Sequence, residues 1–315
     1  MSATKIEWCD YTINPVVGCS KISPGCDNCY AERFAARHAK NPNPKIATKY
    51  AGVVDAAGKW TGKCSRLDLT PFHKLPQKRP LQGQKRVFVG SVTDLFHRGN
   101  SFEDLRHIWK QMVFLSQYTF CLLTKRPDRM YAFCEDNANP PLPNVWLGVT
   151  VCNHEEADEK IPVLLDTPAA KRFVSIEPML GPIDLRFRRA PTDRDYRGWN
   201  GDGPIDYVET TRVDELHWVI CGGESGPGVR PMHPGWVRRL RDQCVETGVP
   251  FFFKGWGAWI PAQMHSNGKL GTWHNGIFLD GFTNTDDLSA NMCRFKGKAL
   301  GHRLLDDREW NEVPV

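Results

Sequence analysis

Three cysteines near the start of the sequence have the residue type and the spacing of metal ligands. Cys19, Cys26 and Cys29 form a C-x6-C-x2-C pattern within the stretch GCSKISPGCDNCYAE. The first residues, MSATKIEWCD, lack the apolar run of a signal peptide, so we expect a reducing cytosolic setting. In that setting, closely spaced thiols bind metals more often than they form disulfides. The chemistry to expect from this loop is binding of a metal ion or a metal cluster.

The three thiols allow three interpretations. A structural zinc ion needs four ligands, and the fourth would have to come from Cys9, His38 or Cys64. A cubane [4Fe–4S] cluster held by only three thiolates keeps one iron open for a substrate or cofactor. Unliganded thiols packed in a core are the third interpretation. We expect the cluster, because the chain has one C-x2-C pair where zinc ribbons have two. Small buried side chains are the expected role of Cys121, Cys134, Cys152, Cys221, Cys244 and Cys293.

Seven apolar runs, mostly separated by helical patterns, are the elements that must position this loop. They are WCDYTINP (8–15), the core of RVFVG (87–89), YTFCLLT (118–124), VWLGVTV (145–151), RFVSIEP (172–178), HWVICGG (217–223) and VPFFFKG (249–255). One helical pattern begins at Asn100 or Ser101 and another ends at Gly248. This alternation predicts parallel strands joined by right-handed crossovers.

The expected fold class is therefore α/β, as a complete or partial (β/α) TIM-like barrel, with a doubly wound open sheet as the alternative. The barrel would occupy residues 1–260 and carry the cysteine loop at 19–29. A charged, turn-rich insertion is expected near 186–216. Residues 261–315 would form a C-terminal extension packed on the barrel.

Polar residues and glycines follow most of the predicted strands, at the end where parallel α/β folds form their active sites. The set comprises Ser91, Thr93, Asp94, Thr124, Lys125, Arg126, Thr150, Ser175, Glu177, Gly222, Gly223, Glu224, Ser225 and Lys254. Any one of them alone could be an ordinary turn or capping residue. Because the first strand would deliver the cysteine loop to the same rim, we expect the set and the thiols to form one site.

The charge distribution permits a nucleic-acid partner without establishing one. The formal net charge is +5, and the stretch 63–86 carries eight Lys, Arg and His residues against one Asp. That stretch is either a solvated connection or a strip that faces phosphates. Trp256 and Trp259 follow the last predicted strand, and they either pack in the core or stack on a base. No run of eighteen apolar residues occurs, so we expect no membrane partner.

A three-cysteine loop after the first strand of a barrel resembles the radical S-adenosylmethionine (SAM) superfamily, whose commonest spacing is C-x3-C-x2-C. Over nearly its whole length the chain is similar to a phage-associated three-cysteine-motif family, which is itself distantly similar to spore photoproduct lyase. The motifs are KIEWCDYTINPVVGCSKISPGCDNCYAE, VGSVTDLFH, LLTKRP, LGVTV, SIEPMLGPIDL, CGGESGPGVRPMHPGWVRRLRDQC, PFFFKGWG and GHRLLDDREWNEVP. The resemblance implies a barrel of the radical SAM type.

The resemblance also implies cofactors and roles for individual residues. Cys19, Cys26 and Cys29 would hold a [4Fe–4S] cluster whose open iron binds SAM. Reductive cleavage of SAM would yield a 5′-deoxyadenosyl radical, with electrons from a flavodoxin-like or ferredoxin-like donor. The candidates for contacts with SAM are Tyr30, Ser91, Asp94, Lys125, Thr150, Glu177, Gly223 and Glu224. The candidates for contacts with the substrate are Arg126, Arg230, Lys254 and Trp256. No catalytic residue is assigned.

The function that we expect is hydrogen abstraction from a nucleobase or nucleotide, in the cytoplasm of a bacterium or a phage-infected cell. Isomerisation or modification of a thymine substituent in DNA is an example of such a reaction. The alternative is a nucleic-acid-binding protein that a zinc ion or a cluster stabilises and that has no catalytic activity. A hydrolase in which Glu177 and Glu224 hold a metal ranks third, because the sequence lacks a histidine-rich ligand set such as H-E-x-x-H.

Overall fold

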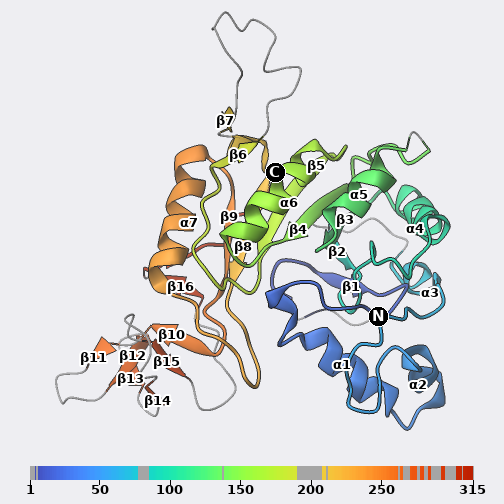
Figure 1. Ribbon diagram of the computed structural model, residues 1–315, viewed down its shortest axis with the longest axis horizontal. Coiled ribbons are helices and arrows are strands. Elements are labelled where there is room, and N and C mark those ends of the chain that lie inside the picture. The colour runs from blue at the N-terminus through green and yellow to red at the C-terminus, as the bar shows by residue number, and fades with distance from the viewer. Residues whose placement is uncertain are drawn as a thin grey trace, which may run out of the picture.

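Seven parallel strands form one curved sheet in the computed structural model of the protein. The structure describes residues 4, 6–76, 85–136, 138–189, 208–210, 212–261, 263–264, 270–274, 277–279, 283–284, 292–294, 303–306 and 308–314. The strands are β1 (Tyr11–Ile13), β2 (Lys85–Val89), β3 (Tyr118–Thr124), β4 (Val145–Thr150), β5 (Lys171–Ile176), β8 (Trp218–Gly222) and β9 (Phe251–Gly255), and they lie in that order. The order never reverses, and β1 and β9 form the two edges, so the sheet is a half-barrel (Figure 1). The prediction of a partial α/β barrel is confirmed at this level.

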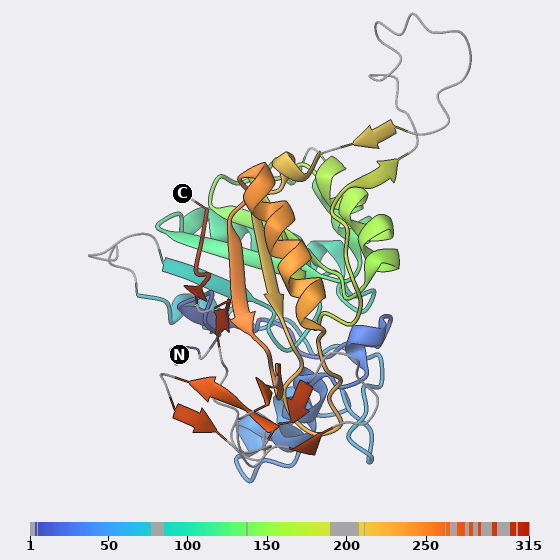
Figure 2. The same cartoon turned by 90° about the vertical axis from the view of Figure 1, so that its left-hand side faces the viewer.

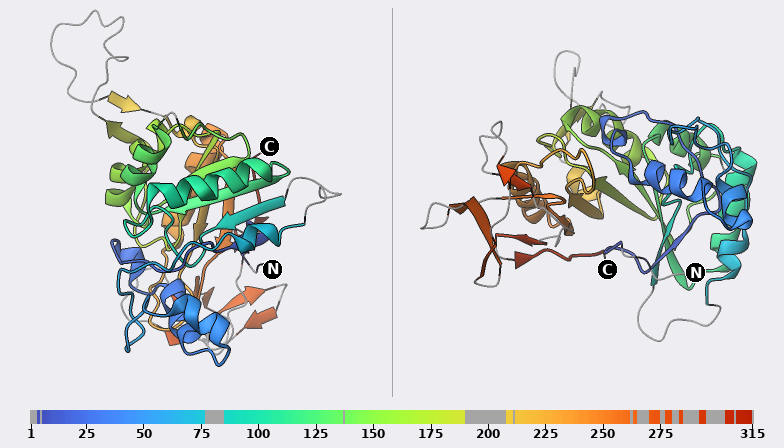
Figure 3. Two further views of the ribbon diagram at one scale, coloured as in Figure 1. Left: turned by 90° about the vertical axis from the view of Figure 1, so that its right-hand side faces the viewer. Right: turned by 90° about the horizontal axis from the view of Figure 1, so that it is seen from below.

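Helices follow most of the strands, and all but the first two, which pack on each other, lie against the sheet (Figures 1 and 3). They are α1 (Tyr30–Ala39), α2 (Pro44–Tyr50), α3 (Thr70–His73), α4 (Phe102–Phe114), α5 (Pro127–Cys134), α6 (His154–Asp166) and α7 (Pro234–Thr247). Helix α4 begins at Ser101 with a capping box to Asp104, and α7 ends at its C-cap Gly248, both as predicted. Helix α5 was not predicted individually from the sequence; Pro127 occupies its first turn, where a proline is well tolerated.

The two faces of the strands bury different sets of side chains, because successive residues of a strand point to opposite faces. On the outer face, Val87 and Val89 of β2 belong to the main core with residues of the helices. On the inner face, Phe88 joins a second cluster that fills the amino-terminal half of the half-barrel. That cluster contains Trp8, Cys9, Phe88, Cys121, Trp146, Phe173, Trp218, Ile220 and Phe252. We call this cluster the aromatic floor.

Gly148 makes the aromatic floor possible at β4. A Cβ atom at this position would lie 2.5 Å from Cζ of Phe173, so only glycine lets that ring cross the inner face of the strand. The ring of Phe173 in turn packs against Trp8 and Trp218, with centroids 6.3 and 6.1 Å away. The inner face is therefore closed by rings at the end where the strands begin.

The remaining strands belong to small antiparallel sheets. The pair β6 (Phe187–Arg189) and β7 (Val208–Thr210) lies within the predicted insertion, whose residues 190–207 fall outside the described ranges. Two three-stranded sheets are built from β10 (Trp259–Pro261), β14 (Thr283–Asn284) and β15 (Met292–Arg294), and from β11 (Gln263–Met264), β12 (Leu270–His274) and β13 (Ile277–Leu279). The β6–β7 pair projects at the end of the molecule opposite these sheets (Figures 1 and 2).

The end of the chain lies along the free edge of β9. After the hairpin β16 (Leu304–Leu305) and β17 (Arg308–Glu309), Phe253 N donates to Trp310 O at 2.9 Å. The indole of Trp218 donates to Glu312 O at 2.8 Å. These residues of the expected C-terminal extension thus contact the sheet, while a domain boundary at residue 260 stays a prediction. None of the helices in the described ranges combines the length and the hydrophobicity needed to cross a bilayer.

Candidate cofactor and substrate site

A cavity of about 450 Å³ lies at the carboxyl ends of the strands, beyond the aromatic floor. The period of two along each strand explains its lining. On β5 and in the loop after it, Phe173 belongs to the floor while Ser175 and Glu177 line the cavity. On β9, Phe252 belongs to the floor and Lys254 lines the cavity. Strands β5 and β9 therefore each supply a ring at depth, with a polar side chain at or just after the strand end.

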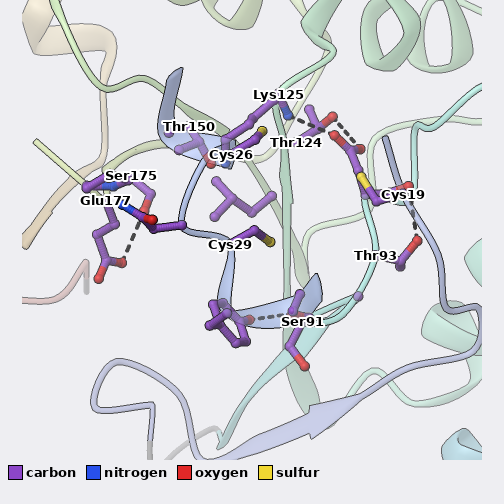
Figure 4. Close-up of a pocket in the computed structure, with 18 of the residues that line it drawn as sticks. Cys19, Cys26, Cys29, Ser91, Thr93, Thr124, Lys125, Thr150, Ser175 and Glu177 are labelled. Carbon is purple, nitrogen blue, oxygen red and sulfur yellow. Dashed lines mark hydrogen bonds between the residues drawn. The ribbon is translucent and has the colours of Figure 1, made fainter. Parts of the chain in front are cut away.

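The cysteine loop forms one wall of this cavity. Cys19, Cys26 and Cys29 all line it, and all three are free and partly exposed (Figure 4). Cys26 ends the short 3-10 helix η1 (Pro24–Cys26), and Cys29 is the N-cap residue of α1. Burial and the negative charge of Asp94 raise the pKa of the Cys19 thiol to about 11, although a nearby guanidinium opposes this shift. The loop therefore brings the three thiols to one cavity.

Arg126 holds the first end of the cysteine loop. Its guanidinium donates to the carbonyl and the hydroxyl of Ser20, at 3.0 and 2.9 Å, and approaches Cys19 Sγ at 3.9 Å. The same guanidinium forms an ion pair with Asp94 at 2.8 Å. The Asp94 carboxylate also accepts from the Thr124 hydroxyl and from backbone amides, including that of Lys125. Asp94 and Arg126 were predicted to contact SAM and the substrate, but here their polar groups are engaged in positioning the loop.

A second arginine holds the other end of the loop. Arg230 donates to Asp27 Oδ2 at 3.1 Å, to Pro24 O at 2.8 Å and to both oxygens of the Glu224 carboxylate. Asn28, which lies between the last two cysteines, also donates to Glu224, at 3.1 Å. These bonds keep the pKa of Glu224 below its usual value even though burial opposes ionisation. Glu224 and Arg230 therefore form a clamp on the loop, with few polar atoms left for a ligand.

Gly223 lines the cavity and is also packed against the segment that follows β9, to which Trp256 belongs. A Cβ atom on Gly223 would lie 2.2 Å from Trp256 O, so the glycine permits close packing of two backbone segments. Trp256 is 4 % exposed, packs edge to face on Phe253 and donates its indole N–H to Leu304 O. Trp256 belongs to the main core and is not part of the cavity lining, which is the core-packing alternative named for it above.

The other predicted residues do lie at the cavity. Lys254 forms an ion pair with Glu177 at 2.7 Å, which raises the pKa of Lys254 although burial acts in the opposite direction. The Tyr30 hydroxyl donates to Ser91 O. Thr150 and Lys125 complete the set, and both line the cavity. Within the described part of the chain, the Lys125 ammonium group has no hydrogen-bond or ion-pair partner, whereas its backbone N–H is bound to Asp94.

The candidates for a fourth metal ligand lie apart from the cavity lining. Cys9 belongs to the aromatic floor, and His38 stacks on Phe34 with the ring centroids 3.9 Å apart. Cys64 Sγ lies 3.3 Å from Nδ1 of His97, whose Nε2 lies 2.9 Å from the Ser20 hydroxyl. His97 was not among the predicted site residues. It closes the motif VGSVTDLFH, and its place after β2 is the one signal in the sequence that indicated it.

The arrangement of donor atoms differs from that of a preformed zinc site. Among the described side chains, no three His, Cys, Asp or Glu residues are close enough together to share one metal ion. A zinc ion would hold its thiolates ~3.8 Å apart, because each Zn–S bond is about 2.3 Å long. In a cubane cluster each thiolate binds a different iron, so the three sulfur atoms stand further apart. Three partly exposed thiols that line one cavity are the donor set from which the cluster is expected.

The basic stretch 63–86 is described only in part. Its residues 77–84, which include Lys78 and Arg79, fall outside the described ranges. Of the rest, Lys85 pairs with Asp10 at 3.2 Å and Arg86 donates to Trp8 O at 2.8 Å. The predicted phosphate-facing role of this stretch therefore stays a prediction.

Comparison with known proteins gives a family but no relative with an assigned activity. No curated protein and no solved structure matches the chain. One family model matches, and it spans residues 3–314. The chain therefore belongs to the family described as "Protein of unknown function (DUF5131)".

Proposed function

We propose that this protein is a radical SAM enzyme that abstracts a hydrogen atom from a nucleobase substrate. The observation that carries the proposal is the placement of three free thiols from one loop around a single cavity. Cys9 and Cys64, the other cysteines considered as ligands, lie outside the lining of that cavity. A [4Fe–4S] cluster held there would have one iron without a protein thiolate, and when bound it would supply the electron that cleaves SAM.

The cavity offers groups that suit a zwitterionic cofactor. The Lys125 ammonium is available to pair with the SAM carboxylate, since its own side chain has no partner among the described residues. Glu177 and Lys254 form an ion pair at 2.7 Å in the cavity lining, so they offer a negative and a positive group to a ligand. Ser175 donates to Glu177 at 3.2 Å and orients that carboxylate. A volume of about 450 Å³ falls in the range of cavities that enclose ligands of this size.

Two features support a nucleobase as the substrate. The rings of Trp8, Tyr30, Trp60 and Phe88 line the same cavity, and aromatic side chains bind the faces of unstacked bases. The similarity to the phage-associated family and to spore photoproduct lyase favours the same substrate class. Within that class, isomerisation or modification of a thymine substituent is the reaction that we propose.

Anaerobic reconstitution with iron and sulfide tests the proposal. We expect about four iron and four sulfide per chain, as one cubane requires, and 5′-deoxyadenosine after SAM and dithionite are added. Cys26→Ala should remove most of the iron and the 5′-deoxyadenosine. Cys64→Ala is the matched control, because it removes a partly exposed thiol outside the cavity lining and should keep both.

Two outcomes would contradict the proposal. If zinc is bound and Cys64→Ala releases it, the site is a four-ligand structural site, and the chain is a binding protein without radical chemistry. If Cys26→Ala retains full iron content, the three-thiol loop does not hold the cluster. Dependence of 5′-deoxyadenosine formation on added thymidine oligonucleotide would identify the substrate class.

A further inference from the structure

A second cavity, of about 520 Å³, adjoins the first at the cysteine loop. Ser20, Lys125 and Arg126 line both cavities. The second cavity is otherwise built by residues after β2, by the start of α5 and by one face of α6. It is rich in cations, because Arg98, Arg129 and Lys160 join Lys125 and Arg126 in its lining. This concentration of positive charge beside the candidate site is not required by the cluster or by SAM.

Only some of these cations are neutralised by carboxylates. Arg126 pairs with Asp94 at 2.8 Å, and Lys160 pairs with Glu156 at 2.6 Å. Among the described residues, no carboxylate oxygen lies within 4.0 Å of the charged groups of Arg98, Lys125 and Arg129. The two other carboxylates of the lining, Asp128 and Glu159, are exposed.

Arg129 is held in a position that suits an anionic ligand. Its guanidinium lies over the Phe102 ring, 4.8 Å from the centroid, and donates from Nη2 to Asn100 O at 2.5 Å. Its Nε is buried and has no hydrogen-bond partner. Burial and the positive charges of Arg98 and Arg126 lower the pKa of Arg129, so these guanidinium groups repel one another. An anion between them would relieve this repulsion and accept from the unpaired groups.

The surroundings of the second cavity also indicate which kind of molecule carries the anion. Helix α5 starts beside the cavity without a side chain capping its first amides, which adds a partial positive charge. Ile22, on the cysteine loop, lines the cavity and is 49 % exposed, so an apolar surface lies next to the cations. Because Lys125 and Arg126 line both cavities, a polyanion bound in the second would reach the first directly. A nucleic-acid strand has this combination of spaced phosphates and apolar sugar faces.

We propose that the second cavity binds a backbone phosphate of the nucleic-acid strand whose base enters the first cavity. The identity of the base-binding cavity rests on the proposed function, whereas the phosphate site stands on the cations described above. The ligand class is a phosphodiester of single-stranded or locally opened nucleic acid. Arg98 and Arg129 are the contacts, Lys125 stays with the ligand of the first cavity, and Arg126 positions the cysteine loop between the two cavities.

Fluorescence anisotropy with a labelled oligothymidylate tests the phosphate site, with SAM omitted and wild-type protein as reference. Arg98→Ala should weaken binding about fivefold at 0.1 M salt, since each single-strand phosphate contact contributes a salt slope of ~0.7. The slope of log affinity against log salt should fall by about the same ~0.7. Arg98→Glu should weaken binding further. Arg239→Ala and Arg239→Glu are the matched controls, because Arg239 is exposed on α7 and lines neither cavity.

Equal affinities and salt slopes for Arg98→Ala and Arg239→Ala would overturn the proposal. Tight binding of inorganic phosphate with no binding of the oligonucleotide would also overturn it, because the site would then take a free anion. A protein that binds the oligonucleotide as expected but yields no 5′-deoxyadenosine keeps the phosphate site and loses the proposed function. If the protein yields 5′-deoxyadenosine but Arg98→Ala leaves the oligonucleotide affinity unchanged, the proposed function is kept and the phosphate site is lost.

Discussion

Replacing Arg230 by alanine tests whether the cysteine loop is held by the protein itself. The substitution removes four side-chain hydrogen bonds, of which two go to Glu224, one to Asp27 and one to the carbonyl of Pro24. The Glu224 side chain is only 6 % exposed, so its carboxylate would lose its cation in a poorly solvated place. It would keep the backbone N–H of residue 230 at 2.7 Å and the Asn28 amide at 3.1 Å.

The expected loss of stability follows from these contacts. Removing one partner of a fully buried ion pair costs about 3–5 kcal/mol, and the two remaining donors reduce that penalty. The bond to Asp27 adds little, because its side chain is 63 % exposed. We therefore expect Arg230→Ala to lower the free energy of unfolding by about 2–3 kcal/mol. The midpoint of thermal unfolding should fall by roughly 4–8 °C.

Urea unfolding of the apoprotein and iron content after reconstitution measure the effect. Arg106→Ala is the matched control, because Arg106 forms one ion pair with Asp136 and both side chains are about two-fifths exposed. The control should lose at most about 1 kcal/mol and should keep its iron. Arg230→Lys, which keeps the charge but loses the planar fork, should lie between the two. If Arg230→Ala unfolds at the same urea concentration as Arg106→Ala and binds the same iron, the clamp does not hold the loop.

Two further predictions concern residues beside the site. Burial, together with the positive charge of Arg126, lowers the pKa of His97, so the folded state favours the neutral ring whose Nδ1 accepts from Gly99 N. This contribution to stability is present above the unfolded pKa of about 6.5 and is lost as pH falls below it, so pH-dependent urea unfolding should weaken there and His97→Gln should flatten the profile. Gly148→Ala should cost about 1–3 kcal/mol, because the new Cβ would lie 2.5 Å from the Phe173 ring. The double variant with Phe173→Leu should recover part of that loss in thermal unfolding, and a neutral Gly148→Ala would contradict the packing.

The strands and the rim of the site were predictable because they depend on local patterns. Apolar runs such as YTFCLLT are buried on both faces of a parallel sheet, and the polar residue after each run falls at the same edge. Ser91, Thr150, Glu177 and Lys254 could therefore be placed at one cavity without knowing any contact between them.

What the polar residues do at that cavity could not be predicted from their order. Glu224 is engaged by Arg230 and Asn28, and Asp94 by Arg126, through contacts that join distant segments. Sequence spacing carries no information on such partners. A carboxylate at a strand end that is bound by an arginine therefore cannot be told from one that is free to bind a ligand. The sequence left core packing and base stacking open for Trp256 for the same reason, since its burial depends on packing that the residues after β9 create.

The separation of the two strand faces also affects how this protein can change over time. Residues that shape the cavity belong to one face, and residues that join the sheet to the helices belong to the other. A substitution at Thr150 or Ser175 alters the cavity and leaves the helix-packed core intact. The lining of the cavity can therefore diverge within the family through single inner-face positions while the packing between sheet and helices is kept. Under the proposed function, these are the positions to vary when a different base is to be accommodated.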